Sequence, residues 1–273
     1  MTTVSVATCE TGEPFSINFD ETPHVLFGGT TGSGKSNALN VLVARCVLGG
    51  SETSIIDLCE VDFIEWAAAG VEVVTDYQSV AGYIECVMDV MASRIAHVRK
   101  HGFVRMADVP NGERLPHKVV IVDEVQMLLQ PGRDKTSREI AARCELGLFH
   151  LLSLGRKAGL SMVLATQKPA ADVIPSRLRD LCGVRVACRT ETRDVTDTIL
   201  GAGASSLGAE AHMISPRFPG TAIVKIDGSK FRRVRFPYFD MRPVAVATLA
   251  DVKAGRTGTE GATSSINGEE GNQ

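Results

Sequence analysis

The chain has 273 residues, of which 44% are hydrophobic and 22% are charged, so a fibrous or wholly disordered protein is excluded. The 29 Lys and Arg against 32 Asp and Glu give a formal net charge of −3, so a polyanionic partner would have to be held by a local basic patch. The 7 cysteines form no CxxC pair, which argues against a zinc site and for a reducing compartment. No apolar run is long enough to span a bilayer, and we expect a cytoplasmic protein.

Short β-branched runs alternate with longer segments of helical period along the chain. This order is typical of successive βαβ units and predicts an α/β fold with a mostly parallel sheet. Between the second and third expected strands, apolar residues from Ile84 to Val98 fall on one stripe, which predicts a helix that ends near Gly102. The expected strands cover residues 25–27, 54–57, 119–123, 162–165, 184–188, 222–226 and 232–236.

The strongest chemical signal is the segment GTTGSGKS, which follows the first of these strands, opens a helical segment and fits the pattern GxxxxGK[ST]. Glycines let backbone N–H groups surround phosphate oxygens, and the helix N-terminus adds a favourable dipole. Lys35 would reach the β- and γ-phosphates and Ser36 would ligate Mg²⁺. A glycine-rich loop that binds nothing is the alternative, but the strand, loop and helix in register disfavour it. The sequence therefore predicts an ATP-binding loop made of Gly29, Thr30, Thr31, Gly32, Ser33, Gly34, Lys35 and Ser36.

A second signal is the apolar strand KVVIV, which runs directly into Asp123 and Glu124. In P-loop NTPases, an acidic residue at the end of such a strand holds Mg²⁺, and we assign this role to Asp123. Glu124 is placed to orient and deprotonate the attacking water. An exposed acidic pair without a function is the alternative, and the phosphate loop disfavours it. The pair favours hydrolysis of ATP over phosphoryl transfer to a small acceptor.

Several segments together resemble the FtsK/SpoIIIE family of DNA-pumping ATPases. The phosphate loop alone is unspecific, but the segments occur in the family's order over residues 10–240. They are PHVL leading into GGTTGSGKS, LPHKVVIVDE (115–124), GRKAGLSMVLATQKPAADVIP (155–175), VRVACRTETRDVTDTIL (184–200) and PGTA (219–222).

The resemblance implies a RecA-like P-loop core with flanking helices that assembles into a homo-oligomeric ring, usually a hexamer, around double-stranded DNA. Gln167 matches the family's polar sensor of the γ-phosphate. Arg156 matches an arginine that the family places near the subunit boundary, and it is our first candidate for a finger acting on the neighbour's nucleotide; Arg189 is the second. Residues 25–245 would form the motor, residues 1–24 would supply strands packed on it, and residues 246–273 would form a flexible tail.

The contacts to DNA have the weakest sequence signal, because the basic residues are scattered in small clusters. By analogy with ring translocases, Arg133 and Lys135 in a glycine-containing loop rank first. The arginines at 232, 233 and 235 could equally lie at a subunit interface. Many relatives end the second strand in Asp-Pro-Lys, whereas this chain has Asp57, Leu58 and Cys59, so any role of that lysine is absent.

We interpret the chain as an ATPase that translocates double-stranded DNA, in DNA transfer or segregation. It looks most like the short transfer ATPases of conjugative plasmids and integrated elements, or a phage-borne copy. With no membrane segment of its own, it would reach a membrane only through a membrane-anchored partner protein. Two alternatives stay open: a related ring ATPase that drives protein secretion, and a regulatory protein that binds ATP without translocating anything.

Overall fold

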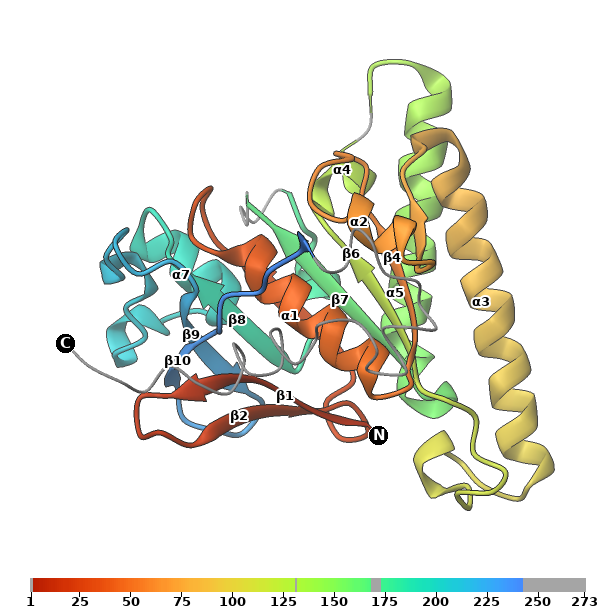
Figure 1. Ribbon diagram of the computed structural model, residues 1–273. Helices are drawn as coiled ribbons and strands as arrows, with labels where there is room; N and C mark the ends of the chain where they lie inside the picture. The colour runs from red at the N-terminus through yellow and green to blue at the C-terminus, as the bar shows by residue number, and fades with distance from the viewer. Residues whose placement is uncertain (1, 131, 168–172, 243–273) are drawn as a thin grey trace.

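A computed structural model describes residues 2–130, 132–167 and 173–242 (Figure 1). Within these residues, ten strands form one sheet in the order β2-β1-β10-β9-β8-β3-β7-β6-β4-β5. The strands are β1 (Thr3–Cys9), β2 (Pro14–Asn18), β3 (Val25–Gly28), β4 (Glu52–Ile56), β5 (Glu72–Val74), β6 (Lys118–Val122), β7 (Leu160–Thr166), β8 (Val184–Cys188), β9 (Thr221–Ile226) and β10 (Arg232–Arg235). The α-helices are α1 (Lys35–Leu48), α2 (Ile64–Ala68), α3 (Tyr77–Lys100), α4 (Gln126–Leu129), α5 (Lys135–Ala158), α6 (Ser176–Arg179) and α7 (Arg193–Leu200).

The sheet has a parallel and an antiparallel part that share β8. Strands β8, β3, β7, β6, β4 and β5 pair in parallel, and β9, β10, β1 and β2 continue from β8 in antiparallel pairs. β3 lies between β7 and β8, although α1 carries the chain from β3 across to β4. The carboxyl end of β3 is therefore at a switch point, where α/β sheets commonly bind ligands.

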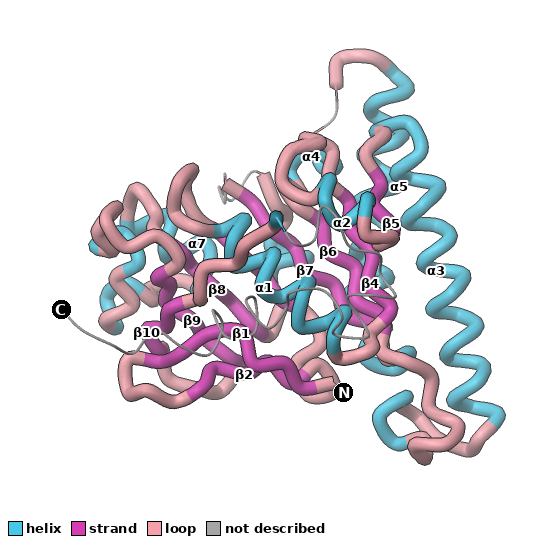
Figure 2. The backbone as a smooth tube through the Cα atoms, in the orientation of Figure 1, coloured by secondary structure: helices cyan, strands magenta, loops and turns pink. Residues whose placement is uncertain are grey.

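Helices cover both faces of the sheet, as Figure 2 shows. On one face, α1 packs with β1 and β2 over residues such as Val119 and Ile121. On the other face, α3, α5 and α7 pack over the alternate residues, such as Val120 and Val122. This alternation follows from the two-residue period of a strand that is buried on both sides. The prediction of an α/β fold with a mostly parallel sheet and flanking helices is confirmed.

The long helix α3 confirms the helix that the apolar stripe from Ile84 to Val98 predicts. Ile84 and Val98 are buried, and Gly102 follows the helix with φ +78°. Arg94 is also buried on this helix, and its Nη2 donates to Glu52 Oε2 and to the carbonyl oxygen of Pro116, both at 2.8 Å. A buried guanidinium is tolerated here because the carboxylate and the carbonyl satisfy it.

The boundaries of some predicted segments differ from the structure. The loop that we predict over 132–135 is shorter, because Asp134 caps α5 through a bond from Ser137 N and the helix begins at Lys135. The edge strand β5 has only three residues and no strong apolar pattern, so the sequence does not predict it. The predicted tail, residues 246–273, lies outside the described residues.

Every cysteine of the chain lies within the described part and is free. Among the helices of that part, none is both long and apolar enough to cross a membrane.

Candidate active site

The phosphate loop leaves the carboxyl end of β3 and is held by both neighbouring strands. Gly29 N donates to Thr166 O on β7 at 3.3 Å, and Thr30 N donates to Arg189 O after β8 at 2.9 Å. Within the loop, Gly32 and Gly34 have φ values of +71° and +92°, which L side chains rarely adopt. These contacts define a rigid turn around the start of α1.

Gly34 is required for a second reason, which is the close approach of another loop. A Cβ atom at Gly34 would lie 2.2 Å from Gly220 N, and Gly220 N donates to Ser33 O at 2.9 Å. The PGTA segment, which leads into β9 at Thr221, therefore packs against the phosphate loop from the side. The segment entered the sequence prediction only as part of the family resemblance, without a role.

Lys35 is the first residue of α1, and its side chain is 3% exposed. Its Nζ donates to Asp123 Oδ1 and lies 2.9 Å from Glu124 Oε1. Burial alone would lower the pKa of Lys35, but the two carboxylates outweigh it and the pKa is raised. The lysine is thus charged, and it forms ion pairs with both acidic residues at the position where the sequence predicts phosphates.

Asp123 and Glu124 follow β6 at the same edge of the sheet. Asp123 N donates to Ile56 O on β4 and Val125 N donates to Ala165 O on β7, each at 2.9 Å, so Glu124 is fixed between two anchored neighbours. Glu124 has φ +48°, which is rare for a side chain of this size and is a form of strain found at functional sites. The backbone therefore holds this carboxylate in a specific direction.

The two carboxylates have different environments. Burial raises the pKa of Asp123, Lys35 opposes the rise only in part, and the charges on Glu124 and Asp62 add to it. Burial would also raise the pKa of Glu124, but Lys35 and two hydrogen-bond donors bring it below the usual range. Glu124 is accordingly an ionised carboxylate, which a general base must be.

The two donors to Glu124 come from Gln126 and Gln167. Glu124 Oε2 accepts a bond from Gln126 Nε2 and one of 2.9 Å from Gln167 N. The Gln167 side chain accepts a bond from the Thr31 hydroxyl in the phosphate loop, so Gln167 connects that loop to Glu124. Gln126 also accepts from the Thr166 hydroxyl at 2.7 Å. Sequence reasoning missed Gln126; its position two residues after Glu124 was the available signal.

The two candidate arginine fingers lie at opposite ends of the sheet. Arg189 follows β8, and its Nη2 donates to Thr31 O at 3.3 Å, so it lies against the phosphate loop of its own chain. Arg156 lies in the last turn of α5, just before β7 begins, and its Nε donates to Asp20 O at 3.3 Å. For Arg156 to act on a neighbour's nucleotide, the neighbour's phosphate loop would have to face the end of α5 that leads into β7. Both finger assignments stay predictions.

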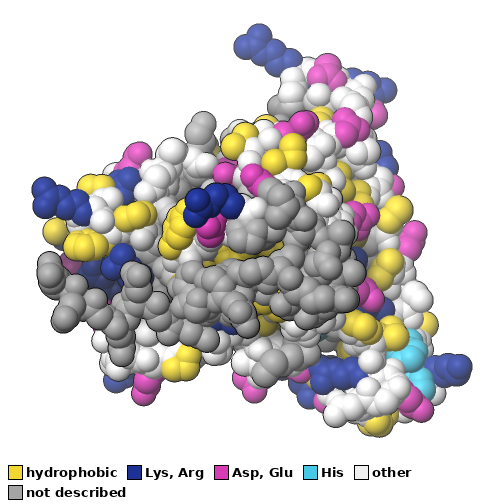
Figure 3. Space-filling view, in the orientation of Figure 1, with side chains coloured by type: hydrophobic (Ala, Val, Ile, Leu, Met, Phe, Trp, Pro, Cys, Tyr) yellow, Lys and Arg dark blue, Asp and Glu magenta, His cyan; other side chains and the backbone are white. Residues whose placement is uncertain are grey.

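The candidate DNA residues Arg133 and Lys135 are exposed where the chain enters α5. Lys135 is also within 3.7 Å of Glu139, one turn along the helix. Lys and Arg side chains project from this tip of the molecule in the space-filling view (Figure 3). The tip is at the opposite end of α5 from the turn that leads into β7 (Figure 1).

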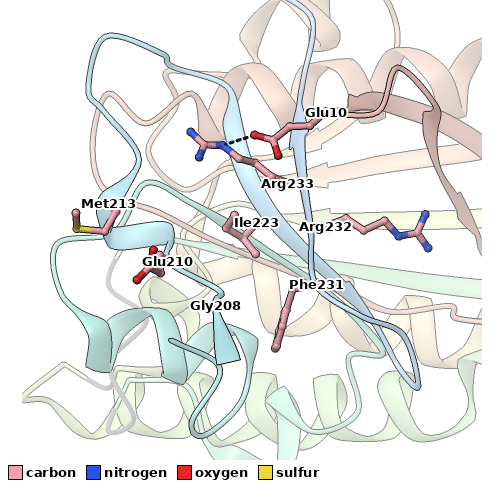
Figure 4. A pocket seen from close by; sticks show the side chains of 8 residues that line it. All are labelled: Glu10, Gly208, Glu210, Met213, Ile223, Phe231, Arg232 and Arg233. Carbon is pink, nitrogen blue, oxygen red and sulfur yellow. Dashed lines mark ion pairs between the residues drawn. The ribbon is translucent and has the colours of Figure 1, made fainter. Parts of the chain in front are cut away.

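The arginines of β10 line a different part of the surface. A pocket of about 240 Å³ lies between this strand and the loops before β9. In Figure 4, Arg232 and Arg233 point away from each other, as successive residues of a strand do, and Arg233 Nε lies 3.2 Å from Glu10 Oε1. Arg235 lies over the ring of Phe218 at 5.9 Å. The pocket is lined by Glu10, Gly208, Glu210, Met213, Ile223, Phe231, Arg232 and Arg233.

The residues at the phosphate loop fit a magnesium nucleotide. Ser36 offers a hydroxyl and Asp123 a carboxylate beside the lysine, which are hard oxygen ligands. In the described part of the chain, no group of three or more His, Cys, Asp and Glu could hold a metal ion alone. Mg²⁺ keeps several waters and usually takes one or two carboxylates together with substrate phosphates, and Ser36 with Asp123 could supply that number of protein ligands.

Comparison with known proteins confirms the predicted resemblance. Residues 2–118 match the model of the FtsK/SpoIIIE family. The chain is homologous to the "DNA translocase FtsK" of Helicobacter pylori strain J99, with 26% identity over 224 residues that cover 77% of this chain and 26% of the relative. The chain spans about a quarter of the length of the curated relatives it matches.

Two solved structures share the fold. The conjugation coupling protein TcpA of pCW3, determined as a monomer with ATPγS, superimposes with a TM-score of 0.81 and 23% identity, covering 93% of this chain and 70% of that chain. The cytoplasmic domain of the type VII secretion ATPase EccC of Thermomonospora curvata gives a TM-score of 0.70 and 20% identity, covering 93% and 31%. The RecA-like P-loop ATPase fold is thereby established.

Proposed function

We propose, from its homology to FtsK-type translocases and from its site, that this chain is the ATPase core of a motor that moves double-stranded DNA. The observation that carries the proposal is the cluster of Lys35, Asp123 and Glu124 at one switch point of the sheet. A lysine that binds phosphate, an acid that can hold a metal and a separate ionised base are the parts that hydrolysis of ATP requires.

The chain's own residues divide the work. Backbone N–H groups of the phosphate loop, other than those of Gly29 and Thr30 that are bonded to neighbouring segments, would surround the phosphates. Lys35 would exchange its carboxylate partners for phosphate oxygens. Ser36 and Asp123 would hold Mg²⁺, which when bound neutralises charge that develops on the phosphates. Glu124 would take a proton from the attacking water, while Gln126 and the backbone of Gln167 keep its other oxygen in place.

Gln167 is our candidate for the link between the nucleotide and the rest of the motor. It touches Thr31 on one side and Glu124 on the other, so a γ-phosphate that displaces either contact would change its position. Rearrangement of the loops around Gln167 would then drive the movement of DNA. We keep a homo-oligomeric ring, a hexamer by analogy with the family, as part of this proposal, and a conjugation-type transfer system as its setting.

The test is ATPase activity with and without duplex DNA over a range of protein concentrations. We expect DNA to stimulate hydrolysis and specific activity to rise with concentration, because a finger from a neighbour is worth roughly 10³–10⁵ in rate. A rate of ATP hydrolysis that is unchanged by DNA but raised by an exported polypeptide would favour the secretion alternative. Nucleotide binding with no turnover under any condition would favour the regulatory alternative.

A further inference from the structure

One contact at the phosphate loop has no part in the function described so far. The hydroxyl of Ser36, the residue after the phosphate-loop lysine, donates to Asp62 Oδ2 at 2.6 Å. Asp62 lies 26 residues further along the chain, in the loop between β4 and α2. Its charge also reaches Asp123, since it contributes to the raised pKa of that carboxyl. Asp62 is thus a third acidic residue near the expected metal position.

The loop that carries Asp62 is held at both of its ends. At the β4 end, the buried Asp57 accepts bonds from Cys59 N and Glu60 N, both 3.1 Å, through its Oδ1 atom. At the α2 end, Phe63 and Trp66 are both 0% exposed. Trp66 Nε1 also donates to Asn40 Oδ1 on α1 at 2.8 Å, so the segment is tied to the same helix that begins with Lys35 and Ser36.

This geometry decides where the lone pairs of Ser36 point. A hydroxyl has one proton to donate and two lone pairs to offer. Asp62 accepts the proton of Ser36, so the lone pairs are directed away from Asp62 and stay free for a cation. Carboxylates that orient metal ligands in this way also raise the basicity of the ligand, and their loss typically costs 10–100-fold in metal affinity.

We propose that Asp62 is a positioning residue for the metal: it holds the Ser36 hydroxyl as a Mg²⁺ ligand and thereby makes nucleotide binding dependent on magnesium. The proposal rests on the proposed function, because it takes Ser36 as a ligand in a nucleotide site. The ligand would be a divalent cation bound together with a nucleoside triphosphate. The contact of Asp62 is with the Ser36 hydroxyl, so it would act on the metal through Ser36.

The experiment measures the affinity of the full chain for a fluorescent ATP analogue over a series of Mg²⁺ concentrations and in EDTA. In Asp62→Asn, the Mg²⁺ concentration at half-maximal effect should rise by about 10–100-fold, while affinity in EDTA stays that of the parent. Glu60→Gln is the matched control, because it removes the same charge from an exposed position two residues earlier in the loop. It should leave both values unchanged.

A double variant separates a role through Ser36 from a general effect of charge. In a Ser36→Ala background, Asp62→Asn should add little, because the contact that it removes is already lost. Mn²⁺ titrated in place of Mg²⁺ and followed by its electron spin resonance reports metal binding directly, and it should show the same loss in the single variants.

Several outcomes overturn the assignment. One is an unchanged Mg²⁺ midpoint in Asp62→Asn. Another is that the changes in Mg²⁺ midpoint caused by Ser36→Ala and Asp62→Asn add fully in the double variant. A third is an equal loss of nucleotide affinity with and without magnesium in Asp62→Asn, which would indicate that Asp62 only holds the loop. A parent chain that binds no nucleotide at any Mg²⁺ concentration overturns the proposed function as well. Normal binding in the parent with an unaffected Asp62→Asn overturns the Asp62 assignment alone.

Discussion

Replacing Glu124 by Gln should separate ATP binding from hydrolysis. The carboxylate has one oxygen near Lys35 and the other bonded to Gln126 and to Gln167 N. Gln has nearly the same shape and its carbonyl oxygen can still accept one of those bonds, but it is a far poorer proton acceptor. General base catalysis contributes about 10²–10⁴ in rate, so we expect a loss of that size, which is about 3–5 kcal/mol of transition-state stabilisation.

ATP affinity should change little in this variant, because the proposed function gives phosphate binding to the loop and to Lys35. Removing one of the two carboxylates that pair with Lys35 also frees the lysine for phosphate, so affinity can increase. Single-turnover hydrolysis and binding of a fluorescent ATP analogue measure the two effects separately. Glu60→Gln again serves as the control for a charge lost from an exposed position.

Turnover of ATP by Glu124→Gln at the parent rate would show that water is activated elsewhere and that Glu124 is not the base. The assignment of Glu124 as the base would also fail if the variant lost ATP binding, because Glu124 would then belong to the metal site or to the fold. Asp123→Asn is expected to behave differently, with a weakened dependence on magnesium as well as lost turnover.

Lys35→Ala should abolish hydrolysis and weaken ATP binding by about 10–100-fold, since it removes charged hydrogen bonds worth about 1.5–3 kcal/mol; normal turnover would mean that the loop is not the site. Arg189→Ala should impair binding even at low protein concentration because Arg189 contacts its own phosphate loop, whereas Arg156→Ala should lower only the concentration-dependent rate; the reverse pattern would exchange the two roles. The pKa values of the buried His24 and His117 are about 3 and about 4 against an ordinary 6.5, so the unfolded chain binds more protons between about pH 4 and 6.5. The free energy of unfolding should therefore fall as the pH drops through that window, by roughly 2 kcal/mol per histidine at pH 5. In urea denaturation, the difference in this free energy between pH 7 and pH 5 should be smaller for His117→Gln than for the parent chain.

The phosphate loop and the Asp-Glu strand could be predicted because their chemistry is local in sequence. Lys35 and Asp123 are 88 residues apart, yet each follows a buried strand, and parallel strands bring their carboxyl ends to one edge of the sheet. The apolar stripe of α3 was predictable for the same reason, since a periodic pattern determines which face of a helix is buried.

The contacts that the sequence did not predict depend on loops. Asp62 reaches Ser36 because Asp57 and Phe63 hold the intervening turn, and Gly220 reaches the phosphate loop from the far end of the chain. No period or spacing encodes such approaches. Gln126 lies in a helix of only four residues, which is too short to leave a periodic pattern, so only its position two residues after Glu124 pointed to it.

Movement along DNA is tested most directly by displacing a third strand from a duplex that carries a triplex at one end. We predict ATP-dependent displacement by the parent chain, and none by Glu124→Gln even where that variant binds the duplex. Hydrolysis of ATP by the parent chain on the same duplex, without any displacement of the third strand, would contradict the claim that this chain is a DNA motor.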